Sequence, residues 1–175
     1  FGSTFTADLN KDVTGGNGGV SVTEAGTSTV TINLNGAGVD VTGGTGNGIG
    51  VTQSSTGSTV IDGDDKTQTI SGAQGISVSG GTAVNTTINV LGSVTGTAGA
   101  GISTSGATGT TKVTTADVTG TTGGITGAVN GDYDLDSTAG KVKSSAGIAI
   151  SVSSAAGKAF ELDTANVDGL TGGIS

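Results

Sequence analysis

The sequence contains no cysteine, histidine, methionine, tryptophan or proline, and its six basic residues are all lysine. The absence of cysteine excludes disulfide bonds and thiolate metal sites. Without cysteine or histidine, the chain cannot assemble a Ser-His, Cys-His or histidine-metal centre of its own. We therefore expect a protein that is not an enzyme. The absence of proline removes one means of blunting edge strands, so we expect these edges to be paired, within the chain or with a neighbour.

Positive charge is also scarce, since 14 acidic residues outnumber the lysines and give a net charge of -8 over 175 residues. Nucleic-acid binding needs a basic surface, and attraction to anionic lipid needs one too. We expect neither, and we expect no membrane insertion because no run approaches the ~18 apolar residues of a membrane span. The sequence shows no signal-peptide pattern, and its start at Phe1 predicts a processed chain or an excerpt of a longer one.

What the sequence does contain is glycine, 36 residues of it, together with short alternating runs of β-branched residues. One pattern recurs six times: glycine, then Val or Ile, any residue, a β-branched residue, then Ser or Thr. Each copy indicates a turn followed by a strand with one apolar face. Only 32% of the residues are hydrophobic and 2% aromatic, which predicts thin β cores. The copies begin at Gly19, Gly38, Gly48, Gly75, Gly101 and Gly147.

The copies at Gly48, Gly75 and Gly101 open related units of roughly 25 residues, each with a second β-branched strand. We interpret these units as serial β-hairpins. The uneven spacing of the six copies counts against a strict solenoid, which needs a fixed period. The predicted fold is all-β, with little or no helix and a sandwich-like or elongated architecture. In residues 29–34, we expect Val30, Ile32 and Leu34 to share one face.

The composition of the sequence changes near residue 128. This change predicts a repeat-like region at 1–128 and a hairpin region at 129–175. Residues 132–136 read as a strand with Tyr133 and Leu135 inward, and 137–140 as a turn leading back into 141–143. Residues 148–152 and 158–163 are expected to form a second hairpin.

Asp132, Asp134 and Asp136 form a candidate calcium site, because three carboxylates at alternate positions lie on one face of a strand. The alternative interpretation is the solvated face of an amphipathic strand. A weaker candidate for cation binding is the predicted turn at 62–65. Asn85 opens a glycosylation sequon within or beside a predicted strand, where chance is the simpler explanation. No other cofactor is expected.

Two stretches carry a resemblance to bacterial surface-assembly proteins. GDYDLDSTAGKVK at 131–143 resembles hairpins in the variable outer domains of flagellins. ISVSGGTAVNTTINV at 76–90 resembles repeats of surface-layer proteins and large adhesins, and is similar to repeats of phage tail fibres and trimeric autotransporter heads. The helical terminal segments with which flagellins polymerise are missing, so a flagellin would be represented only by its exposed middle.

This resemblance implies an extracellular, cell-surface location and a structural role in a filament or surface array. The expected partners are copies of the same chain in a homo-oligomer or polymer. The alternative is an adhesin or phage tail-fibre segment that binds a glycan or a host receptor.

Overall fold

The computed structural model describes residues 2–82 and 84–175, and these residues form strands β1 to β19 with no helix among them. The prediction of an all-β, elongated architecture is confirmed. Within the described residues, no helix is long and apolar enough to cross a membrane.

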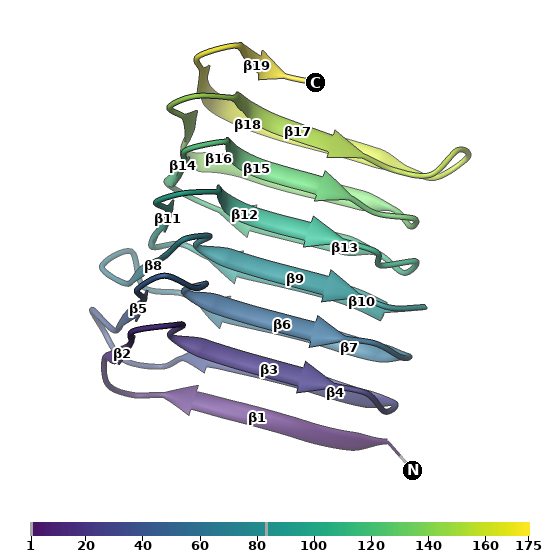
Figure 1. Cartoon of the computed structure of the whole chain (residues 1–175). Helices are drawn as coiled ribbons and strands as arrows, with labels where there is room; N and C mark the ends of the chain where they lie inside the picture. The colour runs from purple at the N-terminus through teal and green to yellow at the C-terminus, as the bar shows by residue number, and fades with distance from the viewer. Residues whose placement is uncertain (1, 83) are drawn as a thin grey trace.

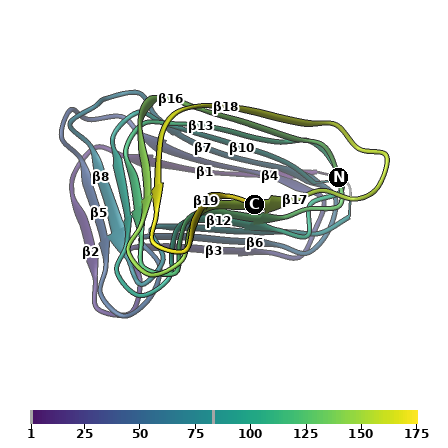
Figure 2. The same ribbon diagram turned by 90° about the horizontal axis from the view of Figure 1, so that it is seen from above.

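The chain winds as a parallel β-solenoid of about 7 turns, which we call rungs 1 to 7 (Figure 1). Seen along the axis, each rung follows three faces (Figure 2). Face 1 contains β1 (Ser3–Leu9), β4 (Ser28–Leu34), β7 (Gly57–Gly63), β10 (Val84–Val90), β13 (Thr111–Thr115) and the first parts of β16 (Tyr133–Ser144) and β18 (Phe160–Gly169). Face 2 contains β2 (Val13–Gly15), β5 (Asp40–Gly43), β8 (Thr69–Gly72), β11 (Ser93–Gly96), β14 (Val118–Gly120) and the second parts of β16 and β18. Face 3 contains β3 (Val20–Glu24), β6 (Ile49–Gln53), β9 (Ile76–Gly80), β12 (Ala100–Ser105), β15 (Gly123–Ala128), β17 (Ile148–Ser153) and β19 (Gly172–Ile174).

The prediction of serial hairpins in a sandwich is wrong, because the strands pair in parallel with the equivalent strands of the rungs before and after. β16 pairs with β13 through its first part and with β14 through its second, so 132–136 and 141–143 lie along one bent strand rather than in a hairpin. Likewise, β17 pairs with β15 and β19, whereas β18 pairs with β16. Sequence-adjacent strands therefore occupy different faces.

The uneven spacing of the Gly-Val/Ile copies did not exclude a solenoid, for two reasons. Five of the six copies open strands of face 3, but the copy at Gly38 belongs to β5 on face 2. A further face 3 strand, β15, begins with Gly123-Gly124-Ile125, which departs from the pattern. The remaining variation lies in the connections, since residues 64–68 join β7 to β8 but only 91–92 join β10 to β11. Loops absorb such insertions while the strands keep their register.

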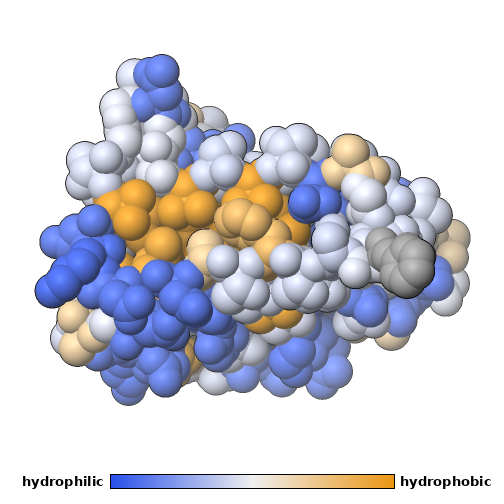
Figure 3. All heavy atoms as spheres, turned by 90° about the horizontal axis from the view of Figure 1, so that it is seen from below, coloured by the Kyte–Doolittle hydropathy of each residue, from blue (hydrophilic) through white to orange (hydrophobic). Residues whose placement is uncertain are grey.

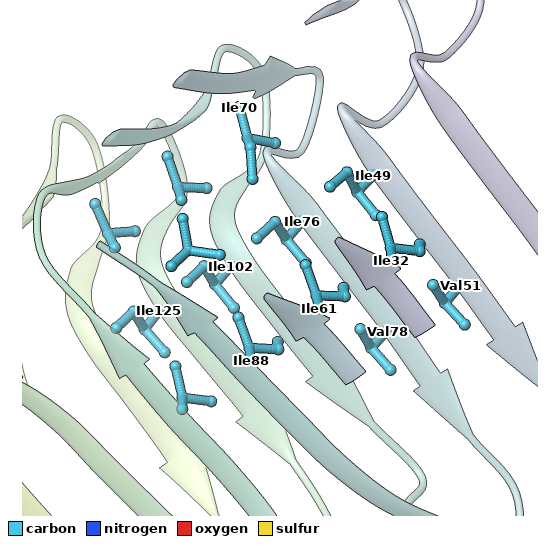
Figure 4. Packing of buried hydrophobic residues seen from close by; sticks show 14 of the residues in the cluster. Ile32, Ile49, Val51, Ile61, Ile70, Ile76, Val78, Ile88, Ile102 and Ile125 are labelled. Atoms are coloured by element: carbon cyan, nitrogen blue, oxygen red, sulfur yellow. The ribbon is translucent and has the colours of Figure 1, made fainter. Parts of the chain in front are cut away.

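The core is a set of apolar ladders that run along the solenoid axis. Ile32, Ile61 and Ile88 follow one another on face 1, and all three are fully buried (Figure 4). Face 3 contributes its own ladder of fully buried isoleucines: Ile49, Ile76, Ile102, Ile125 and Ile150. Parallel strands lie ≈ 4.8 Å apart, so identical β-branched side chains pack directly on one another. A chain with few large apolar residues can thus bury nearly all of them.

A glycine ladder marks the end of face 2, where each rung turns sharply toward face 3. It contains Gly15, Gly43, Gly72, Gly96, Gly120 and Gly169, and Ser144 takes the place of glycine in rung 6. A Cβ at Gly96 would lie 2.0 Å from the carbonyl oxygen of Ala100, which is closer than any real contact. The recurring Val-Thr-Gly triplet of face 2 is therefore a structural repeat, with its first residue in the core and its last in the tight turn.

The orientations predicted for two individual strands are confirmed. In β4, the side chains of Val30, Ile32 and Leu34 point into the core of the solenoid. In β16, those of Tyr133 and Leu135 do the same. The two-region division of the chain stays a prediction. Residue 128 is the last residue of β15, which pairs with β12 on one side and β17 on the other.

Candidate functional site

The three predicted calcium ligands lie in rung 6, near one end of face 1. Asp132 immediately precedes β16, while Asp134 and Asp136 project outward from it and alternate with the buried Tyr133, Leu135 and Ser137. The alternation that suggested three carboxylates on one side of a strand is therefore present in the fold.

Each of these carboxylates has a different hydrogen-bonding partner. Asp132 Oδ1 accepts from the backbone N–H of Ala159 at 3.0 Å, which fixes the next rung. Asp134 accepts from the Lys112 ammonium at 2.9 Å, and this contact raises the pKa of Lys112. Asp136 accepts from the hydroxyl and backbone N–H of Thr138 at 2.7 and 3.0 Å, and these two bonds lower the pKa of Asp136.

No cluster of three or more acidic side chains in the described part of the chain has the arrangement of a metal site. Calcium prefers six to eight oxygen ligands, usually gathered by a loop. Calcium binding by Asp132, Asp134 and Asp136 stays a prediction, and calorimetric titration with calcium is its direct test. Absence of heat would dispose of it.

The weaker candidates occupy ordinary structural positions. Asp62 belongs to strand β7 rather than to a turn, and Asp65 accepts from Thr67 in the connection that follows. Asn85 is exposed on β10, and its side-chain oxygen accepts from the backbone N–H of Thr110 at 2.9 Å. In that contact the side chain of one rung holds the backbone of the next.

A polar ladder on the outside of face 1 was missed by the sequence analysis. It alternates aspartate and asparagine over the first four rungs, through Asp8, Asn33, Asp62 and Asn89. The Asn33 amide donates to Asp8 at 2.8 Å, and the Asn89 amide donates to Asp62 at 2.7 Å. The signal was the recurrence of Asn or Asp directly after the buried isoleucine of β4, β7 and β10, and after Ala7 in β1. Only the parallel register brings these residues together.

Face 3 differs from face 1 in carrying no charge at its outward positions between Ser21 and Ser153, apart from Glu24 at the end of β3. Its outward residues are mainly hydroxyl-bearing: Ser21, Thr23, Thr52, Ser77, Ser79, Ser103, Ser105, Thr126, Ser151 and Ser153. Such a face presents small, uncharged polar side chains along the axis.

Two shallow hollows lie near the N-terminal end. One of ≈ 180 Å³ is lined by residues around Thr4 and Thr29, and one of ≈ 230 Å³ by residues around Asn17 and Asn47. Both are smaller than the roughly 300 Å³ at which small-molecule pockets begin. Neither contains one of the predicted site residues.

The fold and its side-chain ladders define a parallel β-solenoid with an apolar interior, an acidic face 1 and a hydroxyl-rich face 3. No protein-family model matches this chain, and no curated protein or solved structure matches it either.

Proposed function

We propose that the chain is a non-enzymatic structural element of an extracellular bacterial surface assembly, either a filament or a surface array. The observation that carries this proposal is the parallel pairing that continues over seven rungs, with one register shift between Ser137 and Lys141. Backbone hydrogen bonds and core ladders run along one axis, so the chain forms a stiff rod. Its acidic surface favours solubility outside the assembly.

The faces of the solenoid suit a role in which flat surfaces, rather than pockets, contact other proteins. Face 3 offers uncharged hydroxyl groups for lateral packing, whereas face 1 displays the Asp/Asn ladder to solvent. The resemblance of residues 131–143 and 76–90 to bacterial surface-assembly proteins agrees with this role. The partner is a second copy of the chain.

The test combines location with assembly. Antibodies against the chain should label intact cells of the source organism, and electron microscopy of purified material should show filaments or lattices. Isolated particles under all conditions, together with no labelling of intact cells, would contradict the proposal.

The alternative is an adhesin or phage-fibre segment that recognises a glycan or receptor through loops. The observation that favours it is the pair of longer connections, 35–39 and 64–68, which lie on neighbouring rungs between faces 1 and 2 (Figure 1). Saturable binding to a glycan array, abolished when residues 64–67 are replaced by a short Gly-Ser turn, would favour this alternative. A stable trimer in light scattering would favour the fibre form.

A further inference from the structure

Within the described residues, the first and the last rung each pair with another rung on one side only. In the described chain, β1, β2 and β3 pair only with rung 2, and β18 and β19 pair only with rung 6. Each end therefore presents a row of backbone N–H and C=O groups on all three faces. Such rows act as templates for further strands unless something covers them.

The N-terminal end also exposes part of the apolar core. Phe5 is 40% exposed, and Ala7, Leu9, Val13 and Val20 are only partly buried against the core. Viewed from this end, apolar side chains gather at the centre of the surface within a polar rim (Figure 3). An apolar patch with a polar rim is typical of a protein–protein contact.

The C-terminal end exposes an apolar set of its own. Phe160, Leu170 and Ile174 are 46%, 74% and 52% exposed, and Leu162 and Val167 are partly buried. Phe160 stacks on Tyr133 of rung 6 with the ring centroids 6.1 Å apart, so its other side faces the open end.

The two ends match in register. The ladder that begins at Phe5 passes through Val30, continues to Tyr133 and ends at Phe160. In the same way, Val13 and Val167 begin and end one ladder, and Val20 and Ile174 another. Rung 1 of a second copy placed on rung 7 would therefore set Phe5 on Phe160, Val13 on Val167 and Val20 on Ile174.

A side-chain-to-backbone hydrogen bond that joins consecutive rungs inside the chain could also form at the C-terminal end. Asp12 Oδ1 accepts from the backbone N–H of Asp40 at 3.0 Å, and Asp117 Oδ1 accepts from that of Lys141 at 2.9 Å. Asn166 is the next residue in this corner ladder after Lys141. By analogy with Asp12 and Asp117, its side-chain oxygen would accept from the backbone N–H of Asp12 in a second copy.

We propose that copies of this chain stack end to end, rung 7 of one copy on rung 1 of the next, in the register used inside the chain. The contact continues the interface that already joins rung to rung. It is heterologous, and because it continues along the solenoid axis, it generates an open filament rather than a ring. This inference rests on the proposed structural role and specifies the contact that would build the assembly.

One ladder opposes the stacking. It would set Asp163 of one copy against Asp8 of the next, although the first four rungs pair aspartate with asparagine. Like charges repel, and salt screens this repulsion. Stacking should therefore increase with ionic strength. Asp163→Asn would remove this repulsion by placing a neutral amide against Asp8, and should lower the concentration for half-assembly about tenfold. Asp64→Asn, which removes the same charge in an exposed connection, is the matched control.

Cysteine cross-linking tests the register directly, because the natural chain has no cysteine. Neighbouring parallel strands are ≈ 4.8 Å apart, within the Cα separation that a disulfide spans. Oxidation of an equimolar mixture of Asp8→Cys and Asp163→Cys chains should give mixed dimers, and the double variant should give a series of multimers on a non-reducing gel. Asp163→Cys mixed with Thr14→Cys is the control, since Thr14 lies on face 2 of rung 1.

Light scattering of the unmodified chain and two variants supplies the second measurement. Ile174→Lys places a charge on the open apolar end and should keep the chain monomeric. Val60→Lys changes an outward apolar residue of β7 on the side wall and should associate like the natural chain.

The outcomes separate this inference from the proposed function. Assemblies visible by electron microscopy without Asp8–Asp163 cross-links, or with equal cross-linking through Thr14, would overturn end-to-end stacking and leave a structural role in place. Specific cross-links from a chain that never labels the cell surface would support stacking and contradict the proposed location. A chain that stays monomeric and uncross-linked at every concentration and salt level would overturn the stacking.

Discussion

The middle rungs and the terminal rungs of this solenoid are built from the same ladders but differ in what covers them. Ile61 in rung 3 is fully buried, whereas Leu162, which lies in the same ladder in rung 7, is only partly buried. Each middle rung packs against two neighbours and each terminal rung against one. The comparison shows that burial here is a property of stacking, since a single rung is too thin to bury its own side chains.

The largest difference in stability is expected when the same ladder position is truncated in a middle rung and in a terminal rung. Ile61→Ala should lower the free energy of unfolding by about 2–5 kcal/mol, because it leaves a cavity between two rungs that cannot collapse. Leu162→Ala should cost less than about 2 kcal/mol, because solvent already reaches that side chain. Urea denaturation measures both. Equal losses would mean that the terminal rung is covered in solution.

Denaturation at alkaline pH offers a second test, on the ladder that runs from Phe5 to Phe160. Burial raises the pKa of Tyr133 to about 12. The unfolded chain loses this proton near pH 10 and the folded chain near pH 12, so stability is complete below pH 10 and falls as the pH rises toward 12. Two pKa units correspond to about 2–3 kcal/mol.

Tyr133→Phe should abolish this loss, which is measured by denaturation at several pH values. The control adds Phe160→Tyr to that variant, moving the only tyrosine to the partly exposed end of the same ladder. The end tyrosine should titrate near its usual pKa and cause little alkaline loss. A loss as large as that of the natural chain would contradict the difference in burial.

The glycine ladder gives a third test. Gly96→Ala should cost about 1–3 kcal/mol, since the new Cβ would collide with backbone at 2.0 Å. At the end of the solenoid, a Cβ on Gly172 meets only the Ile148 side chain at 3.7 Å, so Gly172→Ala should be nearly neutral. Thermal unfolding compares the two, and a neutral Gly96→Ala would show that the turn has room to relax.

The smallest effects are expected at the two surface ion pairs. Lys112 of rung 5 and Asp134 of rung 6 lie 2.9 Å apart, and Lys141 of rung 6 and Asp168 of rung 7 lie 3.0 Å apart. Exposed pairs gain little because water and salt screen them. Asp134→Asn and Asp168→Asn should both leave the urea midpoint almost unchanged. A large loss for only one of them would mean that charge, as well as burial, distinguishes the two regions.

Local alternation was enough to predict many of the strands and the inward residues of two of them. Val30, Ile32 and Leu34 had to share a face because side chains alternate along a strand, and the same argument placed Tyr133 and Leu135. The sequence could not choose the partner of each strand. Antiparallel hairpins and parallel rungs require the same alternation and the same glycine-rich turns, so the choice between them lies in long-range pairing.

For the candidate site, too, the sequence predicted the local placement of the side chains but not their partners. Asp134 and Asp136 were correctly placed on the outward side of a strand, but their partners, Lys112 from the preceding rung and Thr138 two residues away, emerged only from the fold. The Asp8–Asn33 and Asp62–Asn89 contacts join residues far apart in the chain, and no local pattern measures that separation.

The sequence by itself determined an acidic, cysteine-free, all-β chain whose small β-branched residues alternate with polar ones. These properties follow from composition and from a period of two residues, which are local. The tertiary structure decided that the strands stack in parallel and that the glycines align in one tight corner. Those features depend on which distant segments share a ladder, and that is settled by the packing of one whole rung on the next.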